Sequence, residues 1–442
     1  MKVGGVIHLT YLVIGKVSQN IGNILQVFKF MIHKRTFWLI NQYSSTPETA
    51  MGGRHYYLAR ELAKKGHQVY VIAGSFSHLL RNPKKFKEQI FIEEIIPNFS
   101  FVWINLPEYS EAHSKQRVVN WFKFSWLLRS LTTVIPLRPD VILYSSPSLI
   151  GYLGAKYLAN RFKVPFVFEI RDIWPLTLIE LGGHSPNHPF IKFMQWIEDR
   201  AYKKADFVFS NLYNAVEHMQ SRGLDSSKFH WVPNGVSLDE VSQKQPLSIE
   251  TFKQLPKNKF IIGYTGTIGV ANAIDDLIEA AQILSNKPHL HFVLVGSGKE
   301  KENLIQKVNS LNLQNITFID AIPKKQIQSM LEQFDICYIG WQKNPLYRFG
   351  IAPNKLPEYL YAGKPIIHAF SGKGDIVQQA QAGITIEAED SEAIVKAVEE
   401  LYALTAEQRQ QLGDNGKQFV LQNLEYAMIA EKLENIVFKD NL

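Results

Sequence analysis

The stretch Phe260-Ile261-Ile262-Gly263-Tyr264-Thr265 runs directly into Gly266-Thr267-Ile268-Gly269. A short apolar run followed by a glycine-containing turn is typical of a strand that is buried on both faces and ends in a tight loop. The pattern recurs along the chain from residue 37 onward, with helical periodicity between most of the runs. Such alternation predicts α/β domains with parallel sheets, whose ligands bind at the carboxyl ends of the strands.

A polar, proline-containing stretch at residues 237–259 separates two groups of candidate strands. The first group is residues 37–42, 69–73, 101–105, 141–144, 165–170 and 207–210. The second group is residues 260–265, 291–295, 316–319, 335–339, 365–369 and 383–386. We therefore predict two Rossmann-like domains, residues 36–233 and 234–424, with helical patterns filling the chain after residue 391.

Composition narrows the class of protein. The chain has 442 residues, a net charge of +7 and one cysteine, Cys337, which excludes an internal disulfide and a cysteine-rich metal site. The positive charge suggests an anionic partner, and no domain-sized basic block points to nucleic acid. Residues 1–35 are an extension of uncertain status: a membrane-surface helix, a signal-like segment, or a mis-set start or disordered extension, which we favour.

Basic and aromatic residues mix most densely in residues 115–129. This composition suits contact with an anionic membrane surface, and a core helix with a solvated basic edge explains it equally well. The residues expected to make the membrane contact are Arg117, Trp121, Lys123, Trp126 and Arg129.

Two loops of the first half carry candidate chemistry. Gly52 and Gly53 precede the helix that opens at Arg54, and a helix N-terminus reached through glycines suits a phosphate, although a plain turn explains it as well. The strand at 165–170 runs into Arg171-Asp172, where Asp172 could orient or activate an acceptor hydroxyl. The alternative is a structural Arg171–Asp172 pair that fixes the loop.

The second half offers a stronger pattern. Glycine loops containing Gly266, Gly269 and Gly296 follow two strands, and a helix is expected to begin near Asn354. Lys355 lies in its first turn and Glu358 one turn further on the same face. A cation for phosphate beside a carboxylate for ribose hydroxyls is what a sugar nucleotide needs, and a surface Lys–Glu pair is the plainer alternative.

Several site types lack their signatures. The glycine loops match neither Gly-x-Gly-x-x-Gly nor a P-loop, and no Asp-x-Asp occurs. His184 and His188 are separated by a proline-containing loop rather than a helical turn, which disfavours zinc. We therefore expect no metal and no cofactor, with helix ends and basic side chains neutralising a diphosphate.

These residues resemble family 4 of the retaining glycosyltransferases, which have the GT-B fold. The resemblance covers nearly all of the chain from about residue 36 and is closest to the WbuB-like branch of O-antigen and capsule sugar transferases. It rests on the segments 52–56, 171–175, 233–236, 264–269, 296–298 and 353–356.

The resemblance implies a cleft between the domains, with the nucleotide on the second and the acceptor on the first, and a last helix at 425–442 that returns to the first domain. It implies transfer of an N-acetylated sugar, such as N-acetyl-fucosamine, from a UDP-sugar to a polyprenyl-diphosphate-linked glycan. The enzyme would work as a peripheral protein on the inner face of the cytoplasmic membrane.

The chain departs from the family pattern twice. A family glutamate aligns with Gly350, and the Arg and Lys expected after the first strand of the second domain are absent from Gly269–Ile274. Our hypothesis is that Lys355, with Arg348 as a second candidate, takes over the phosphate contacts.

The resemblance and the loop positions together give three sets of site residues. Asp172 is the catalytic candidate, and Arg54 and Arg171 are on the acceptor side. The donor-binding set is Gly52, Gly53, Gly266, Gly269, Gly296, Arg348, Asn354, Lys355 and Glu358.

Two other functions stay open. A sugar-nucleotide 2-epimerase of the same fold would need further carboxylates around the sugar, where the sequence offers only Asp172 and Glu358. A non-catalytic nucleotide-binding subunit of a polysaccharide assembly complex is supported only by the two departures.

Overall fold

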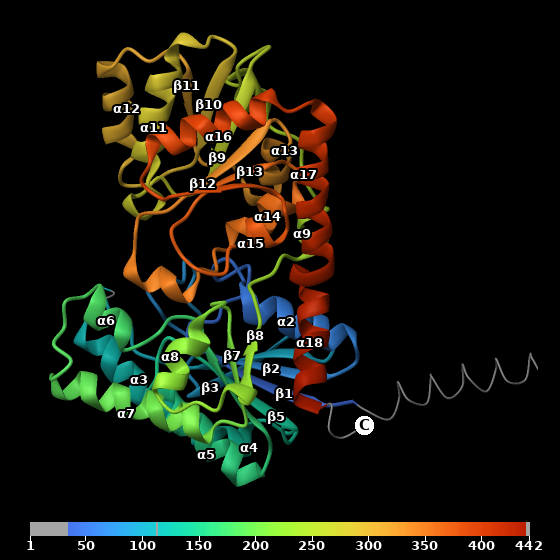
Figure 1. The fold of residues 1–442 in the computed structure, drawn as a ribbon. Helices are drawn as coiled ribbons and strands as arrows, with labels where there is room; N and C mark the ends of the chain where they lie inside the picture. The colour runs from blue at the N-terminus through green and yellow to red at the C-terminus, as the bar shows by residue number, and fades with distance from the viewer. Residues whose placement is uncertain (1–33, 112–113, 439–442) are drawn as a thin grey trace, which may run out of the picture.

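The computed structural model describes residues 34–111 and 114–438, so nearly all of the predicted N-terminal extension lies outside the described residues. Within them, the chain forms two α/β domains, one above the other in Figure 1, joined by the polar stretch before β9 and by the C-terminal helices. Among the helices of these residues, none has the length and apolar character that crossing a membrane requires.

The first domain is built on an eight-stranded sheet in the order β3-β4-β2-β1-β5-β6-β7-β8. All neighbouring strands are parallel except β3 and β4, and Phe37 of β1 pairs with Val69 on one side and Val141 on the other. The strands are β1 (Thr36–Ile40), β2 (Gln68–Gly74), β3 (Ile90–Ile96), β4 (Phe99–Ile104), β5 (Val141–Ser145), β6 (Phe166–Ile170), β7 (Phe207–Ser210) and β8 (Phe229–Trp231).

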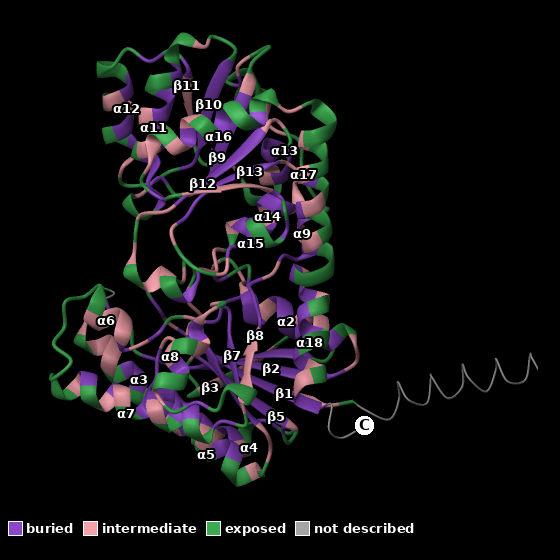
Figure 2. Cartoon of the chain, in the orientation of Figure 1, coloured by how far each residue is buried: buried purple, intermediate pink, exposed green. Residues whose placement is uncertain are grey.

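The second domain has a six-stranded, wholly parallel sheet in the order β11-β10-β9-β12-β13-β14. The strands are β9 (Phe260–Thr265), β10 (Leu290–Val295), β11 (Ile316–Ile319), β12 (Ile336–Gly340), β13 (Ile366–Ala369) and β14 (Gly383–Ile386). Figure 2 shows the central strands of both sheets as buried, as the near-continuous apolar runs predict.

Two strands, β3 and β8, have no counterpart in the sequence-based prediction. Glu93 and Glu94 interrupt the apolar run of β3, which is an edge strand and only half-buried. Glu93 accepts hydrogen bonds from the Trp103 indole and from Lys84, each at 2.7 Å, so tertiary contacts hold a strand that its own pattern does not specify. The half-buried β8 has only three residues.

Helices cover both sheets (Figure 1). In the first domain they are α2 (Arg54–Lys64), α3 (Lys115–Leu127), α4 (Leu131–Val134), α5 (Gly151–Phe162), α6 (Leu176–Glu180), α7 (Pro189–Lys204) and α8 (Ala215–Ser221), with the 3-10 turns η1 (Leu128–Ser130) and η2 (Ser226–Lys228). From the connection onward they are α9 (Leu238–Val241), α10 (Ile249–Lys253), α11 (Ile274–Ile283), α12 (Lys301–Ser310), α13 (Ile327–Leu331), α14 (Lys355–Tyr361), α15 (Ile376–Gln379), α16 (Ser391–Ala403), α17 (Ala406–Phe419) and α18 (Tyr426–Phe438), with the turns η3 (Val270–Asn272), η4 (Leu284–Asn286), η5 (Lys324–Gln326), η6 (Pro345–Phe349) and η7 (Val420–Leu424).

The C-terminal helix α18 crosses back to the first domain and lies beside α2 (Figure 1). Ile429 and Leu433 of α18 are buried in the same hydrophobic cluster as Leu58 of α2 and Val69 of β2. The helix α17 before it packs against α14 in the second domain. The consecutive helices α17 and α18 therefore connect the two domains along one edge of the molecule.

Candidate functional site

A cavity of about 580 Å³ opens between the two domains. On the first domain its walls come from the loops that follow β1, β5, β6, β7 and β8, as expected for the carboxyl edge of a parallel sheet. On the second domain they come from the segment between β12 and α14. The cavity has the size of a small-molecule site.

Three buried polar atoms at this cavity have no hydrogen-bond partner among the described residues. They are Asn211 Oδ1, Asn234 Oδ1 and Arg171 Nε, and all three residues line the cavity. Buried polar groups in a folded protein are normally paired, so unpaired atoms in residues that line a cavity point to a polar ligand or to ordered water. A mixture of donors and acceptors suits the hydroxyl groups of a sugar.

Asp172 follows β6 and lines the cavity. Among the described residues that line the cavity, Asp172 is the only one with a carboxylate. Asp172 is exposed at the cavity, where partial desolvation by the surrounding protein raises its pKa, while the guanidinium of Arg171 lowers that pKa by a smaller amount. The structure therefore places Asp172 on the cavity wall, and its catalytic role stays a prediction.

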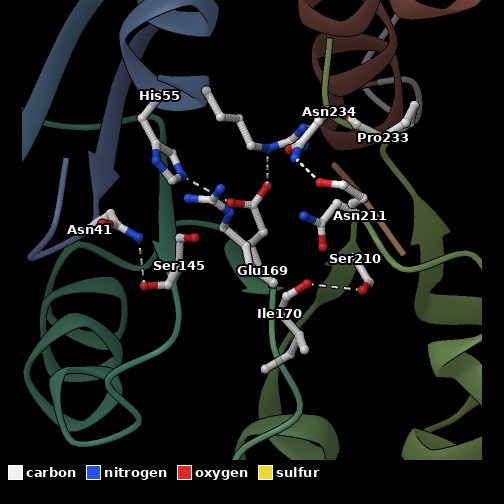
Figure 3. Close-up of polar contacts among 12 residues, drawn as sticks. Asn41, His55, Ser145, Glu169, Ile170, Ser210, Asn211, Pro233 and Asn234 are labelled. Atoms are coloured by element: carbon white, nitrogen blue, oxygen red, sulfur yellow. Dashed lines mark hydrogen bonds and ion pairs between the residues drawn. The ribbon is translucent and has the colours of Figure 1, made fainter. Parts of the chain in front are cut away.

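The floor beneath the cavity is held by the fully buried carboxylate of Glu169 (Figure 3). Its two oxygens lie 2.9 Å from Arg54 Nε and 2.9 Å from His55 Nε2. The Arg54 charge and the bond from His55 outweigh burial and hold the pKa of Glu169 well below its usual range. The beginning of α2 is thereby fixed to the end of β6.

Arg54 also donates from Nη1 to the backbone carbonyl of Pro233, and Asn234 continues the chain of contacts into the second domain. The Asn234 amide donates to Ala352 O at 2.7 Å and to Asn354 Oδ1 at 3.1 Å. Figure 3 shows Pro233 and Asn234 beside this network. Polar contacts therefore run from the first sheet through residues 233–234 to the loop that precedes α14.

Lys355, the first residue of α14, reaches the glycine loop after β9. Its Nζ donates to Tyr264 Oη at 3.0 Å and to Asn272 Oδ1 at 2.8 Å, and it lies 4.6 Å from the centre of the Tyr264 ring. Burial without an ion pair among the described residues lowers the pKa of Lys355 to about 8. A half-buried ammonium held by neutral groups is a cation arranged for an anionic ligand.

Aromatic and backbone contacts fix the position of this lysine. Buried Tyr359 accepts from Thr265 N at 2.6 Å and donates to Thr265 O at 2.8 Å, which ties α14 to the end of β9. The Trp341 indole, 5.5 Å from Lys355 Nζ, donates to His368 Nε2 at 3.0 Å. His368 Nδ1 then donates to Asp375, so a buried polar chain orients the tryptophan at the cavity wall.

Glu358 points away from Lys355. It forms an ion pair with Lys324 and lines a second, smaller cavity of about 330 Å³ with Arg60 of the first domain and Glu240 of the connection between the domains. The helix start directs Lys355 back toward β9, while Glu358 faces the segment after β11. The surface Lys355–Glu358 pair that the sequence left open is therefore not formed.

The predicted donor-binding glycines differ in their role. A side chain at Gly296 would place its Cβ 1.9 Å from Gly266 O, so packing between adjacent loops alone requires this glycine. A Cβ at Gly266 would lie 3.2 Å from Lys355 Nζ, so that position keeps the ammonium accessible. Gly53 and Gly269 border open space, with nothing within 4 Å of a Cβ at Gly53.

The backbone conformation at residue 350 explains why glycine stands where the family has a glutamate. Its φ of 96° is a conformation that side chains rarely adopt, and a Cβ there would lie 3.0 Å from the Tyr213 backbone nitrogen of the first domain. The neighbouring Phe349 is buried in the first domain's core cluster, and Phe349 O accepts from Asn214 N at 2.9 Å. The segment η6 and Gly350 therefore pack against the first domain, and no ligand-binding carboxylate stands at residue 350.

Two predicted ligand contacts need correction. Arg348 forms a two-bond ion pair with Glu180 of α6 at 2.5 and 2.9 Å, so it holds the domains together and does not line the cavity. Arg54 is buried, with its side chain 1% exposed, and serves the Glu169 network and not the acceptor side. Both pairings join residues far apart in the sequence, which the local pattern does not reveal.

The predicted membrane contacts fall into exposed residues, a buried residue and a residue of the cavity wall. Lys123, Trp126 and Arg129 are exposed. Trp121 is buried, with its indole donating to Tyr43 Oη at 2.6 Å, and Arg117 lines the cavity and lies over the rings of Tyr43 and Trp121. Trp121 is therefore wrong as a membrane contact.

Several cavity residues were missed by the sequence analysis. Asn41, Asn211, Asn234 and Trp341 all follow directly or closely after a strand. The rule that ligands bind at the carboxyl ends of parallel strands would have found them, since each is a polar or aromatic residue at such an end. Within the described ranges, no group of three or more His, Cys, Asp or Glu side chains is arranged to hold a metal ion.

Models of known protein families match both domains of the chain. The family model described as "Glycosyltransferase Family 4" matches residues 54–240, and the model described as "Glycosyl transferases group 1" matches residues 248–419. The two matches fall on the two α/β domains in chain order.

Curated relatives are distant in sequence. WcaI of Escherichia coli K12, named for colanic acid biosynthesis, is 23% identical over 276 residues, which is 60% of this chain and 67% of WcaI. The capsular polysaccharide biosynthesis glycosyltransferase CapM of Staphylococcus aureus is 24% identical over 204 residues, 46% of this chain. The matched stretch spans about half of CapM, at 52% of its length.

Solved structures show the fold. Sucrose-phosphate synthase from Thermosynechococcus elongatus superposes with a TM-score of 0.66 at 14% identity, covering 92% of this chain and 99% of that one. Anabaena HepE in complex with UDP and glucose gives a TM-score of 0.61 at 12% identity, covering 92% and 100%. The predicted GT-B fold, with its returning C-terminal helix, is thereby confirmed.

The Glu169 network predicts a large effect of removing one charge. Glu169→Gln leaves the Arg54 guanidinium buried without its counter-charge and should lower the free energy of unfolding by about 3–5 kcal/mol in urea titrations at neutral pH. Because pairing lowers the pKa of Glu169, its contribution is complete above the ordinary carboxyl pKa and is lost as the pH falls below it.

The matched control is Glu217→Gln, which removes an exposed ion pair with Lys373 and should leave the free energy of unfolding almost unchanged. Equal, small effects of the two substitutions would contradict the structural role given to Glu169.

Lys355 predicts a pH dependence of anion binding. With a pKa of about 8 in the empty site, the ammonium loses its proton as the pH rises above that value, so a bound diphosphate must restore it. Calorimetric affinity for UDP should fall by up to about tenfold per pH unit above pH 8. The variant Lys355→Arg stays charged and should show a flat profile; a flat profile in the unaltered chain would refute the assignment.

Proposed function

This chain is a family 4-like glycosyltransferase with the GT-B fold, and we propose that it transfers a sugar, with retention of configuration, from a UDP-sugar to a lipid-linked glycan in O-antigen, capsule or exopolysaccharide synthesis. The observation that carries the proposal is the half-buried, unneutralised Lys355 at the glycine loop after β9, next to a cavity whose wall contains Asp172. A cation for a leaving diphosphate and a carboxylate for an incoming hydroxyl are the two groups that sugar transfer needs.

The donor is proposed to lie against the second domain. Lys355 would meet the diphosphate from the loop after β9, and Asn354 and Gly269 border the same approach. Glu358 would turn from Lys324 toward the ribose hydroxyls, since the smaller cavity offers both groups to a ligand. Support for uridine comes from the family resemblance and from the complex of Anabaena HepE with UDP and glucose.

The acceptor is proposed to enter from the first domain. Arg171, Asn211 and Asn234 line the cavity, and each has a buried polar atom without a hydrogen-bond partner among the described residues. The acceptor hydroxyl would approach Asp172 among them. Asp172 would orient this hydroxyl and polarise its O–H bond. The raised pKa of Asp172 strengthens it as a hydrogen-bond acceptor and a base.

In the proposed reaction, the bond between the sugar's anomeric carbon and the diphosphate oxygen breaks and a bond to the acceptor oxygen forms on the same face of the sugar. The proton of the acceptor hydroxyl passes to the departing diphosphate. Lys355 stabilises the negative charge that develops on the diphosphate in a site shielded from water, where such a contact is strongest. All the groups that these steps require are side chains and substrates, without a metal.

The sugar is proposed to be N-acetylated, such as N-acetyl-fucosamine, and the acceptor to be polyprenyl-diphosphate-linked, as in the WbuB-like branch. Names of relatives such as WcaI and CapM, which refer to colanic acid and capsular polysaccharide, support a role in surface polysaccharide synthesis. Work on a lipid-linked acceptor places the enzyme on the inner face of the cytoplasmic membrane. The single carboxylate among the cavity's described residues disfavours the epimerase alternative.

Turnover with a defined acceptor tests the proposal. Purified protein incubated with UDP-N-acetylated sugars should release UDP only when a polyprenyl-diphosphate glycan is present, with the product anomer unchanged by NMR. Asp172→Asn should lower kcat by about a hundredfold with little change in donor KM, because the side chain acts on the acceptor.

Asp414→Asn, a change in the exposed surface of α17, is the control and should keep full activity. UDP-sugar consumption without acceptor would favour the epimerase, and UDP binding without turnover on any acceptor would favour the non-catalytic subunit.

A further inference from the structure

Large aromatic side chains are exposed together on the outer helices of the first domain. Trp126 of α3 is 65% exposed, Trp196 of α7 is 51% exposed and Phe122 of α3 is 46% exposed. Neither the cavity nor the contact between domains uses them. We define the α3–α7 face by Phe122, Trp126, Arg129, Phe193, Trp196 and Arg200. The helices α3 and α7 lie on the outer flank of the first domain (Figure 1).

Ring contacts join the two helices into one surface. Phe122 stacks on Phe193 with centroids 6.2 Å apart, and Phe193 stacks on Trp196 at 6.1 Å. These rings come from segments about 70 residues apart in sequence, so the cluster is a product of the fold and not of the basic stretch 115–129 alone. Exposed apolar clusters of this kind usually mark a binding surface.

The charges around the rings are of one sign. Arg129 lies 4.5 Å from the Trp126 ring centre and Arg200 lies 5.7 Å from that of Trp196. The acidic residues of α3, α5 and α7 are Glu198, which is buried, and Asp199, which forms a two-bond pair with Arg222. Exposed lysines complete the rim of the face: Lys115, Lys123, Lys192, Lys203 and Lys204.

We propose that the α3–α7 face is the surface with which this protein docks on an anionic lipid bilayer. Tryptophan and phenylalanine enter the headgroup region, while Lys and Arg stems lie along the surface with their charges at the lipid phosphates. The outward, single-sign character of the face complements a negatively charged membrane. A protein partner would need a matching acidic surface. The experiment below distinguishes such a partner from a lipid bilayer.

The placement also connects the bilayer to the cavity. The helix α3 contributes Arg117 to the cavity wall and carries Trp126 about 13 Å further along its axis. With Trp126 in the headgroups, a lipid-anchored glycan has a short route along α3 to Asp172. This last step rests on the proposed function; docking itself does not, and it is measured without any substrate.

Vesicle flotation tests the docking. The full chain should bind vesicles of phosphatidylethanolamine and phosphatidylglycerol at low salt, release them at high salt, and ignore phosphatidylcholine vesicles. Both the double variant Trp126→Ser/Trp196→Ser and the double variant Lys123→Glu/Lys192→Glu should bind at least about tenfold more weakly. Thermal unfolding at an unchanged temperature confirms that the variants fold.

Matched controls lie on the second domain. Lys253→Glu/Lys396→Glu makes the same change in net charge away from the face, and Phe252→Ser removes a side chain that is 57% exposed; both should keep full binding. Equal loss in the charge control would reduce the effect to net charge and overturn the proposal. Absence of vesicle binding in the unaltered chain, with or without capture of a soluble protein by the face, would also overturn it.

Discussion

The carboxylate of Glu169 lies fully buried beneath the cleft, between the Arg54 guanidinium and the His55 ring. A charge in this position is tolerable only with its partners in place, so the start of α2, the end of β6 and the Pro233 carbonyl must adopt one arrangement. Asn234 extends that arrangement to the backbone before α14. One polar network therefore sets both the floor of the cavity and the position of the loop before α14.

The second domain uses this fixed frame to hold a cation. Tyr359 anchors α14 to β9, and Tyr264, Asn272 and Trp341 surround the ammonium of Lys355 without neutralising it. The clasp formed by Phe349 and the Arg348–Glu180 pair closes the domains on the opposite side from α18. The side chains around Lys355 are thus already oriented, which limits the reorganisation needed to stabilise a negative charge beside it.

Much of this architecture is readable from the sequence. Strands β7, β9, β11 and β14 match the predicted bounds, because short runs rich in apolar residues between helical patterns mark the strands of a parallel sheet. The glycine loops, Asp172 and Lys355 follow from the rule of carboxyl ends. What the sequence hides is pairing at long range: Arg54 and Arg348 look like ligand-binding groups until Glu169 and Glu180 occupy them. The half-buried edge strand β3 is invisible for the same reason, since its partners supply its stability.

The central claim is a division of labour across the cleft, with Lys355 serving the nucleotide and Asp172 serving the acceptor. Calorimetric titration with UDP of the unaltered chain, Lys355→Ala and Asp172→Ala tests it most directly. The account predicts that Lys355→Ala weakens UDP binding by about a hundredfold, as expected for a lost charge-assisted contact, while Asp172→Ala leaves the affinity within about twofold. Unchanged binding in Lys355→Ala, or a large loss in Asp172→Ala, would contradict it.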